Sequence, residues 1–230
     1  MSRFLAVMSL LGAAHAHAQS AVSVVNGRLS VSTPSGDQNI KFLVGPAAGQ
    51  TAVFGVPGLP DGAAYTGITA IDLVTGSGFD KVEFDINAPQ SLAISAHTGA
   101  GQAETKIQWK VPPGTPEANA IVHLASATGA TKTELDFVSE AVNTTFDWTM
   151  AGGAGNKEVK GGIDFKTGGS SGAATIAFDL GFGRHTAVFE IESEVPGTSI
   201  GIDSGPNVHE SITKILADKP SDLLTIVHHS

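Results

Sequence analysis

One carboxylate in the sequence has the surroundings of a metal ligand. Asp80 lies in the segment TGSGFDKVEF (75–84), in which Gly76 and Gly78 allow a tight turn directly before a strand-like run. Calcium takes about six to eight oxygen ligands, which carboxylates and turn carbonyls can provide. One aspartate supplies at most one carboxylate, and the similar segment GGAGNKEVK (152–160) carries Lys157 where Asp80 stands. Asp80 is therefore the one candidate metal ligand, and calcium is a disfavoured cofactor because turn geometry alone accounts for the glycines.

Other acidic residues recur between two apolar neighbours. They are Asp72, Asp85, Asp136, Asp147, Asp164, Asp179 and Glu190. In strands stacked about 4.8 Å apart, such acids could form a ladder on one face of a sheet. Like charges in a ladder repel one another, so we favour solvated side chains in imperfect register.

Paired acids could also hydrolyse a polysaccharide, since glycoside hydrolysis uses two carboxylates roughly 5–9.5 Å apart. Sugar-cleaving enzymes generally add aromatic platforms, yet the sequence has one tyrosine and two tryptophans, and Trp109 and Trp148 both fall at inward-facing positions. We therefore expect no catalytic residues and a protein that is not an enzyme. A polysaccharide hydrolase or lyase is the alternative.

Short runs that alternate apolar and polar residues dominate the sequence and predict half-buried strands. They are KVEFDI (81–86), KIQWKV (106–111), TELDF (133–137), TFDWTM (145–150), GIDF (162–165), TIAFDL (175–180) and AVFEI (187–191). Glycine is abundant, with 28 of 230 residues, and punctuates these runs. The sequence therefore predicts an all-β protein.

A frame of small residues and glycines followed by a strand repeats along the chain. It begins near residues 75, 98, 128, 152, 167 and 181. Intervals in the twenties favour a parallel β-solenoid, or β-helix, in which each coil stacks on the last. The shorter intervals leave an antiparallel β-sandwich as the alternative.

The glycine frames resemble those of degenerate hemolysin-type (RTX-like) secreted proteins. That family has the nonapeptide G-G-x-G-x-D-x-U-x, where U is a large apolar residue. Residues 75–83 match it at Gly76, Gly78, Asp80 and Val82 but have Thr75 in place of the first glycine. The resemblance implies a secreted parallel β-roll or β-helix, in which two facing turns of the family bind calcium.

The first 18 residues read as a signal peptide, with Arg3, a short apolar run and the sequence AHA (16–18) before the cleavage point. Residues 19–230 then form a single solenoid domain. Its C-terminal cap, at about 206–230, is expected to contain a short helix because Ile212, Ile215 and Leu216 have helical spacing. We expect no transmembrane segment, since no later apolar run is long enough to span a bilayer.

The chain has no cysteine and a formal net charge of −9 at pH 7. An exported protein without disulfides is typical of bacteria, so we expect a secreted, extracellular protein of bacterial origin, or one held in the periplasm or at the cell surface. The negative charge disfavours nucleic-acid binding.

These observations favour a secreted, non-catalytic structural protein: an extracellular matrix component, an adhesin or a fibril subunit. We expect self-association through the ends or edges of the solenoid, because unpaired strand edges recruit other strands. A polysaccharide or a cell surface is a further candidate partner. A carbohydrate-binding module or polysaccharide-degrading enzyme is the alternative function.

Overall fold

The computed structural model describes residues 19–45, 49–166, 171–194, 199–204, 210–217 and 223–228, with side chains as far as residue 194. These residues form strands joined by turns, with no helix among them, so the all-β prediction is confirmed. The strands are β1 (Ala21–Val25), β2 (Arg28–Ser32), β3 (Gln38–Val44), β4 (Thr51–Phe54), β5 (Ala63–Tyr65), β6 (Ala70–Val74), β7 (Gly78–Asn87), β8 (Leu92–Thr98), β9 (Gly101–Val111), β10 (Glu117–Ser126), β11 (Thr131–Ser139), β12 (Asn143–Gly152), β13 (Lys157–Phe165), β14 (Ser171–Asp179), β15 (His185–Ser193), β16 (Ser199–Ser204), β17 (Glu210–Ala217) and β18 (Leu223–His228).

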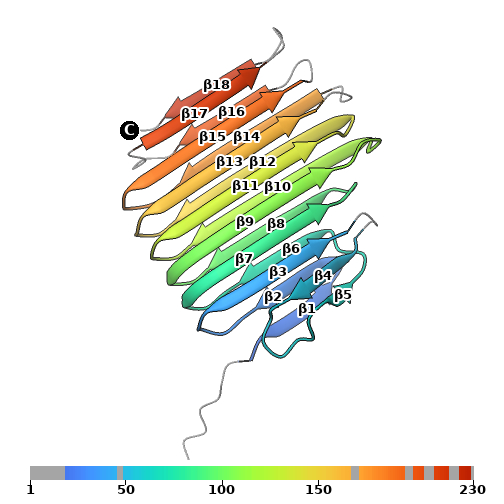
Figure 1. Cartoon of the computed structure of the whole chain (residues 1–230), viewed down its shortest axis with the longest axis vertical. Coiled ribbons are helices and arrows are strands. Elements are labelled where there is room, and N and C mark those ends of the chain that lie inside the picture. Colours follow the sequence, from blue (N-terminus) through green and yellow to red (C-terminus); the bar gives the residue numbers. More distant parts are fainter. Residues whose placement is uncertain are drawn as a thin grey trace, which may run out of the picture.

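From β6 onward the chain alternates between two sheets, so that each strand pairs with the strand two places further along. Sheet A has the order β1-β2-β6-β8-β10-β12-β14-β16-β18, and sheet B has the order β17-β15-β13-β11-β9-β7-β3-β4-β5. Neighbouring strands pair in parallel, with antiparallel pairing at β1–β2, β3–β4 and β4–β5. Figure 1 shows the strands as two stacks that progress along the longest axis in chain order.

Alternation along each strand explains why these segments form half-buried sheets. In β7, Val82, Phe84 and Ile86 are buried, whereas Lys81 and Asp85 point outward and are exposed. A period of two places every second residue on the same face of a strand. Each of the predicted alternating runs lies in a strand of the structure, apart from the final residue of 175–180.

The core lies between the two sheets and is built from the inward residues of both. Phe137 of β11 stacks on Phe146 of β12 with ring centroids 4.4 Å apart. Trp148 of β12 meets Phe189 of β15 edge-on at 5.7 Å. Such contacts between aromatic rings stabilise a fold beyond the burial of their area. The aromatic residues of the repeated strands therefore hold sheet A against sheet B.

The N-terminal end of the stack contains strands that sequence periodicity does not predict. Strand β1 turns back on β2, and β4 and β5 form an antiparallel extension of sheet B beside β3. The three-residue β5 ends sheet B, with no further strand beyond it in the described part of the chain. This end of each sheet therefore finishes in antiparallel strands.

The prediction of a short helix in the C-terminal cap is wrong for the described residues. Ile212, Ile215 and Leu216 lie in β17, which pairs in parallel with β15, and residues 223–228 form β18 beside β16. The helical spacing is a local preference of one short segment. In β17 the backbone groups on the side of β15 pair with that strand, and this tertiary pairing overrides the local preference.

Glycines stack in a column where the chain passes from sheet A to sheet B. The column, here called the glycine corner, contains Gly36, Gly78, Gly101, Gly129, Gly155 and Gly183, all with positive φ. At Gly129 φ is +115°, and an added Cβ would lie 1.7 Å from the carbonyl oxygen of Gly101 in the preceding layer. Only a residue without a side chain fits at this position, because both the backbone conformation and the space are closed to others.

Candidate functional site

The predicted ligand Asp80 lies inside the molecule, next to the glycine corner. Its side chain is 1% exposed, and its Oδ2 accepts a hydrogen bond of 2.6 Å from the hydroxyl of Thr75. The other carboxylate oxygen, Oδ1, has no hydrogen-bond partner. Burial raises the pKa of Asp80 above its usual range, because removal from water penalises the charged form.

Asp80 belongs to a row of inward-facing residues in register with one another, here called the corner row. The row consists of Gln38, Asp80, Ala103, Thr131, Lys157 and His185. Two members of the row donate hydrogen bonds to carbonyl oxygens of the corner. Gln38 Nε2 donates to Gly36 O at 3.1 Å, and Lys157 Nζ donates to Gly129 O at 2.8 Å. These two donors serve the turn, since a buried carbonyl without a partner is costly.

Lys157 is the second ionisable member of the corner row, at 2% exposure. Its ammonium also donates to Thr131 Oγ1 at 3.0 Å, so both of these partners are neutral oxygens. Burial lowers the pKa of Lys157 below its usual range. The ammonium thus contacts the same kind of oxygen that a cation in a glycine turn would contact.

Among the described residues, no group of three or more histidine, cysteine or acidic side chains is placed to hold a metal ion. Asp80 brings one carboxylate and a hydroxyl neighbour, which is fewer than the oxygens that calcium takes. Asp37 is a second acid near Asp80, but its Oδ1 accepts a hydrogen bond of 2.9 Å from the Phe79 N–H, so most ligands of a calcium ion here would have to be backbone carbonyls or water.

Replacing Asp80 with asparagine is expected to stabilise the protein by about 1–2 kcal/mol at pH 7, because a buried acceptor without a partner costs a comparable amount. The amide would donate to the corner as Gln38 does. Because the pKa of Asp80 is raised, the folded state of the wild type binds a proton more readily than the unfolded state. Wild-type stability should therefore rise as the pH falls through the raised pKa, and Asp80→Asn should lack this rise.

Urea unfolding at a series of pH values measures this effect, with Asp85→Asn as the control. Asp85 is an exposed acid on the same strand, so its replacement should change stability by less than about 0.5 kcal/mol. Destabilisation by Asp80→Asn, together with a lower unfolding midpoint of the wild type in chelator, would instead assign the carboxylate to a bound cation.

The recurring acids between apolar neighbours do not form a continuous ladder. Asp85, Asp136 and Glu190 share one outward column of sheet B, but Gln108 and Gly162 stand between them. The others are distributed over both sheets: Asp164 lies in a different column of sheet B, and Asp72, Asp147 and Asp179 lie in three columns of sheet A. Imperfect register, the interpretation favoured from the sequence, is confirmed.

The outer face of sheet B carries charges in an alternating pattern across the strands. One column runs Lys41, Glu83, Lys106, Glu134, Lys160, and the next column runs Lys81, Glu104, Lys132, Glu158. Each lysine of these columns therefore lies beside an acid on a neighbouring strand, and Lys132 also lies beside Glu134 of its own strand. Lys41 Nζ lies 2.7 Å from Glu83 Oε1, and Lys132 Nζ lies 2.8 Å from Glu134 Oε1. The pKa of Lys41 is raised and that of Glu83 is lowered, first of all by their mutual hydrogen bond.

The outer face of sheet A is built differently: it carries many short polar or apolar side chains, and Glu117, Asp147 and Asp179 are its acids on β10, β12 and β14. Its outward positions on β8, β10, β12 and β14 include Ala93, Ser95, Asn119, Ala125, Asn143, Thr145, Thr149, Ala151, Ser171, Ala173, Thr175 and Ala177. These positions are here called the small-residue face. Among the residues described, no strand of sheet A contains a lysine.

A shallow groove of about 460 Å³ lies on the small-residue face. Alanines 125, 151 and 177 contribute to its lining, with His97, His123 and Asp179 around them. His123 Nδ1 lies 2.5 Å from the hydroxyl of Thr149 on the next strand. The groove arises because alanine leaves space between longer neighbours.

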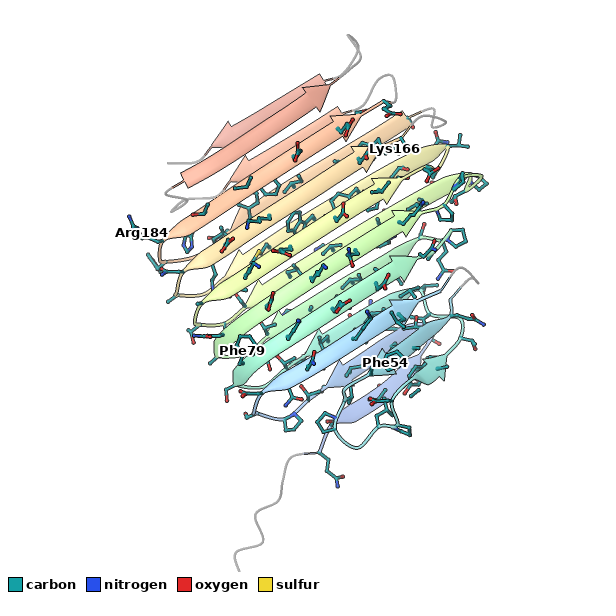
Figure 2. All side chains as sticks on the ribbon, viewed as in Figure 1. Phe54, Phe79, Lys166 and Arg184 are labelled. Carbon is teal, nitrogen blue, oxygen red and sulfur yellow. The ribbon has the colours of Figure 1, made fainter. Side chains whose placement is uncertain are left out.

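The two tryptophans expected to face inward do so, since Trp109 is 2% exposed and Trp148 is 1% exposed. Neither can act as the floor of a sugar-binding groove. Of the remaining histidines, His185 belongs to the corner row, where its Nε2 lies 3.1 Å from Gly181 O. His209 and His229 lie outside the described residues. Figure 2 shows Phe79 and Arg184 projecting from the glycine corner, with Lys166 at the opposite margin of the sheets.

Comparisons with protein-family models, with curated proteins and with solved structures gave no match to this chain. The described residues include no helix of the length and apolar character that crossing a membrane requires. The predicted signal peptide, residues 1–18, lies outside the described residues. What the molecule does must be inferred from its own geometry.

Proposed function

We propose that this chain is a parallel β-solenoid with two strands per coil, and that it serves as a non-catalytic structural subunit outside the cell. The strand order supports this, because from β6 to β18 each sheet grows by one parallel strand per coil. In such a stack each coil contacts its two neighbours and extends the same core. The glycine corner also supports a relation to the hemolysin-type (RTX) rolls. In this chain Lys157 stands at a position where the repeat of those rolls has an aspartate.

The two ends of the stack support association in one direction. Strands β17 and β18 end sheets B and A, and each pairs with one parallel strand, β15 or β16, in the described part of the chain. On its outer side, neither strand pairs with another described strand. At the other end, sheet B finishes in the short antiparallel β5. An open parallel edge is a template for β-strand addition, whereas short and reversed edge strands discourage it.

The observation that carries the proposal is that two strand edges at the same end of the stack, those of β17 and β18, have no partner among the described strands on their outer side. A second copy, or a strand of a surface partner, would extend both sheets at once through main-chain hydrogen bonds. This association requires no particular side chains and suits an extracellular matrix component, an adhesin or a fibril subunit.

Two adjacent proline variants on the edge strand test this proposal. Successive N–H groups of a strand point to opposite sides, so of Leu224→Pro and Thr225→Pro one removes a donor to β16 and the other removes an outward donor. We expect the wild-type protein, beginning at Gln19, to sediment as concentration-dependent assemblies. The outward variant should retain wild-type thermal stability and lose these assemblies.

Sedimentation velocity and electron microscopy measure the assemblies, and the thermal unfolding midpoint identifies the outward variant. A wild-type protein that remains monomeric up to high concentration would overturn edge association. So would two proline variants that both assemble like the wild type.

A further inference from the structure

We propose that copies of this chain join head to tail, with β1 and β5 of one copy adding to β18 and β17 of the next, so that both sheets continue through the junction. The inference rests on the proposed function, because it names the partner of the β17 and β18 edges. That partner is the opposite end of a second copy, and the contact is main-chain pairing in a fixed direction.

The two ends of the stack are stepped in opposite ways. At the first end, sheet A has one strand beyond β2, namely β1, whereas sheet B has two strands beyond β3, namely β4 and β5. The chain passes directly from β2 to β3, so these two strands belong to one coil. At the other end β16 and β17 form one coil, after which sheet A continues with β18 and sheet B has no further described strand. Figure 1 shows β18 at one tip of the stack, and β1 with β5 at the other.

These two steps fit each other. Sheet B extends one strand further than sheet A at the first end, and each sheet has nine described strands in all. A second copy displaced by nine layers therefore places its β1 beside β18 and, in the same movement, its β5 beside β17. Sheets with different numbers of strands would not both be continued by one displacement. Nine layers of about 4.8 Å correspond to a displacement of roughly 43 Å.

The strand directions define the pairing at the junction. Strand β1 runs antiparallel to β2, whereas β5 runs in the direction of β3 because two reversals separate them. The parallel pairings along each sheet give β18 the direction of β2 and β17 the direction of β3. The junction is thus antiparallel in sheet A and parallel in sheet B. One short reversed strand is a poor template, but two offered one layer apart select an end with the matching step.

The edge of β1 lacks the features that protect strand edges. Residues Ala21–Val25 include no charged residue and no proline, and their register with β2 continues without a bulge. Charges, prolines and bulges are the usual means of preventing edge pairing. Among the described residues, the backbone of β1 pairs with β2 alone. Residues 223–227 of β18 are also uncharged, so no like charges oppose the contact between the two strands.

The core is incompletely covered at the β1 end. Val24 stands opposite Leu29 in the β1–β2 pair, so both side chains point to the same face of sheet A. Leu29 is 0% exposed, yet Val24 is 42% exposed. The loop 55–62 covers part of this end, since Val56 is buried and Leu59 packs against the core. A further strand beside β1 would cover Val24, as neighbouring coils cover the core elsewhere in the stack.

Val24→Lys is the main test, with Val25→Lys as its matched control. Both residues lie on β1 and are exposed, but successive side chains of a strand point to opposite faces. Lysine at 24 places its charge between layers at the junction, whereas lysine at 25 lies on the outer face. In sedimentation velocity we expect Val24→Lys to raise the concentration required for assembly at least 10-fold, and Val25→Lys to assemble like the wild type. The thermal unfolding midpoints of both variants should match the wild type.

Mixing two blocked variants separates this inference from the proposed function. Val24→Lys keeps the end with β17 and β18, whereas the outward proline variant of β18 keeps the end with β1 and β5. Each variant alone should be monomeric, and their mixture should form one-to-one dimers without longer species. Wild-type filaments should repeat every 43 Å, approximately nine layers, in electron micrographs.

Two results would overturn head-to-tail pairing and leave edge association standing. One is a Val24→Lys protein that assembles like the wild type while the outward proline variant does not. The other is a dimer formed by Val24→Lys alone, because this dimer would join two β18 ends. A mixture that stays monomeric would also overturn the pairing of β1 with β18. A wild-type protein that remains monomeric would overturn both proposals.

Discussion

Replacing Gly129 with alanine is expected to destabilise the protein by more than about 3 kcal/mol, which is large for a single methyl group. The added Cβ would lie 1.7 Å from the carbonyl oxygen of Gly101, and φ at this position is +115°. The contact is with backbone rather than with the end of a flexible side chain, so two layers would have to separate. Separation would break the hydrogen bond from Gly101 N to Thr128 O that joins these layers, at 2.8 Å.

Gly162→Ala is the matched control, because it adds the same methyl group to a glycine in the next coil. A Cβ at Gly162 meets the Asp136 carboxylate at 3.5 Å, which is an ordinary contact, and its φ is not in the positive region. This variant should be neutral or stabilise the fold by up to about 1 kcal/mol, since glycine weakens a strand interior. Denaturant unfolding monitored by tryptophan fluorescence compares the two. Equal stabilities would show that the glycine corner does not require glycine.

Lys157→Ala is expected to cost about 3 kcal/mol, because it leaves a cavity in place of the buried lysine chain and removes the donor to two buried oxygens. Lys157→Met should cost clearly less, since it fills the space and removes the expense of a buried ammonium. The difference between these two variants separates the packing of the chain from the role of its charge.

The buried Lys157 makes the free energy of unfolding depend on pH in a predictable direction. Its folded-state pKa is lowered from the usual 10.5, so between the lowered value and 10.5 the unfolded state holds the proton and the folded state does not. Wild-type stability relative to Lys157→Met should therefore rise as the pH increases through this window. The pKa values of Lys41 and Lys166 are raised, which makes the stability fall as the pH rises. The comparison with Lys157→Met is needed because it cancels this opposite contribution. A flat difference across the alkaline range would contradict a buried charged lysine.

Much of the strand content follows from short-range patterns. Alternation such as that of residues 81–86 identifies a half-buried strand because the side-chain period of a strand is two. The C-terminal segment shows where such patterns fail: residues 212–216 have helical spacing, yet β15 offers an edge to pair with. The antiparallel β4 and β5 were also missed, because short strands at the end of a sheet carry no repeat to align.

The candidate sites were less accessible from the sequence. Asp80 and Lys157 could be matched through the glycines that precede them, but their burial depends on which way each strand faces in the stack. The column of sheet A that runs from His97 to Asp179 could not be predicted, because 82 positions separate its ends in the sequence and only the parallel register brings them into line. The alternating charges of sheet B depend on the same register.

The glycine corner makes the length of this molecule adjustable. Each coil runs from one corner glycine to the next, for example from Gly101 to Gly129, and adds a layer of about 4.8 Å to the stack. Inserting or deleting one such unit would move the end of the molecule by a fixed step without altering the remaining layers. The number of such segments, rather than a redesign of the core, would then set the length of the stack.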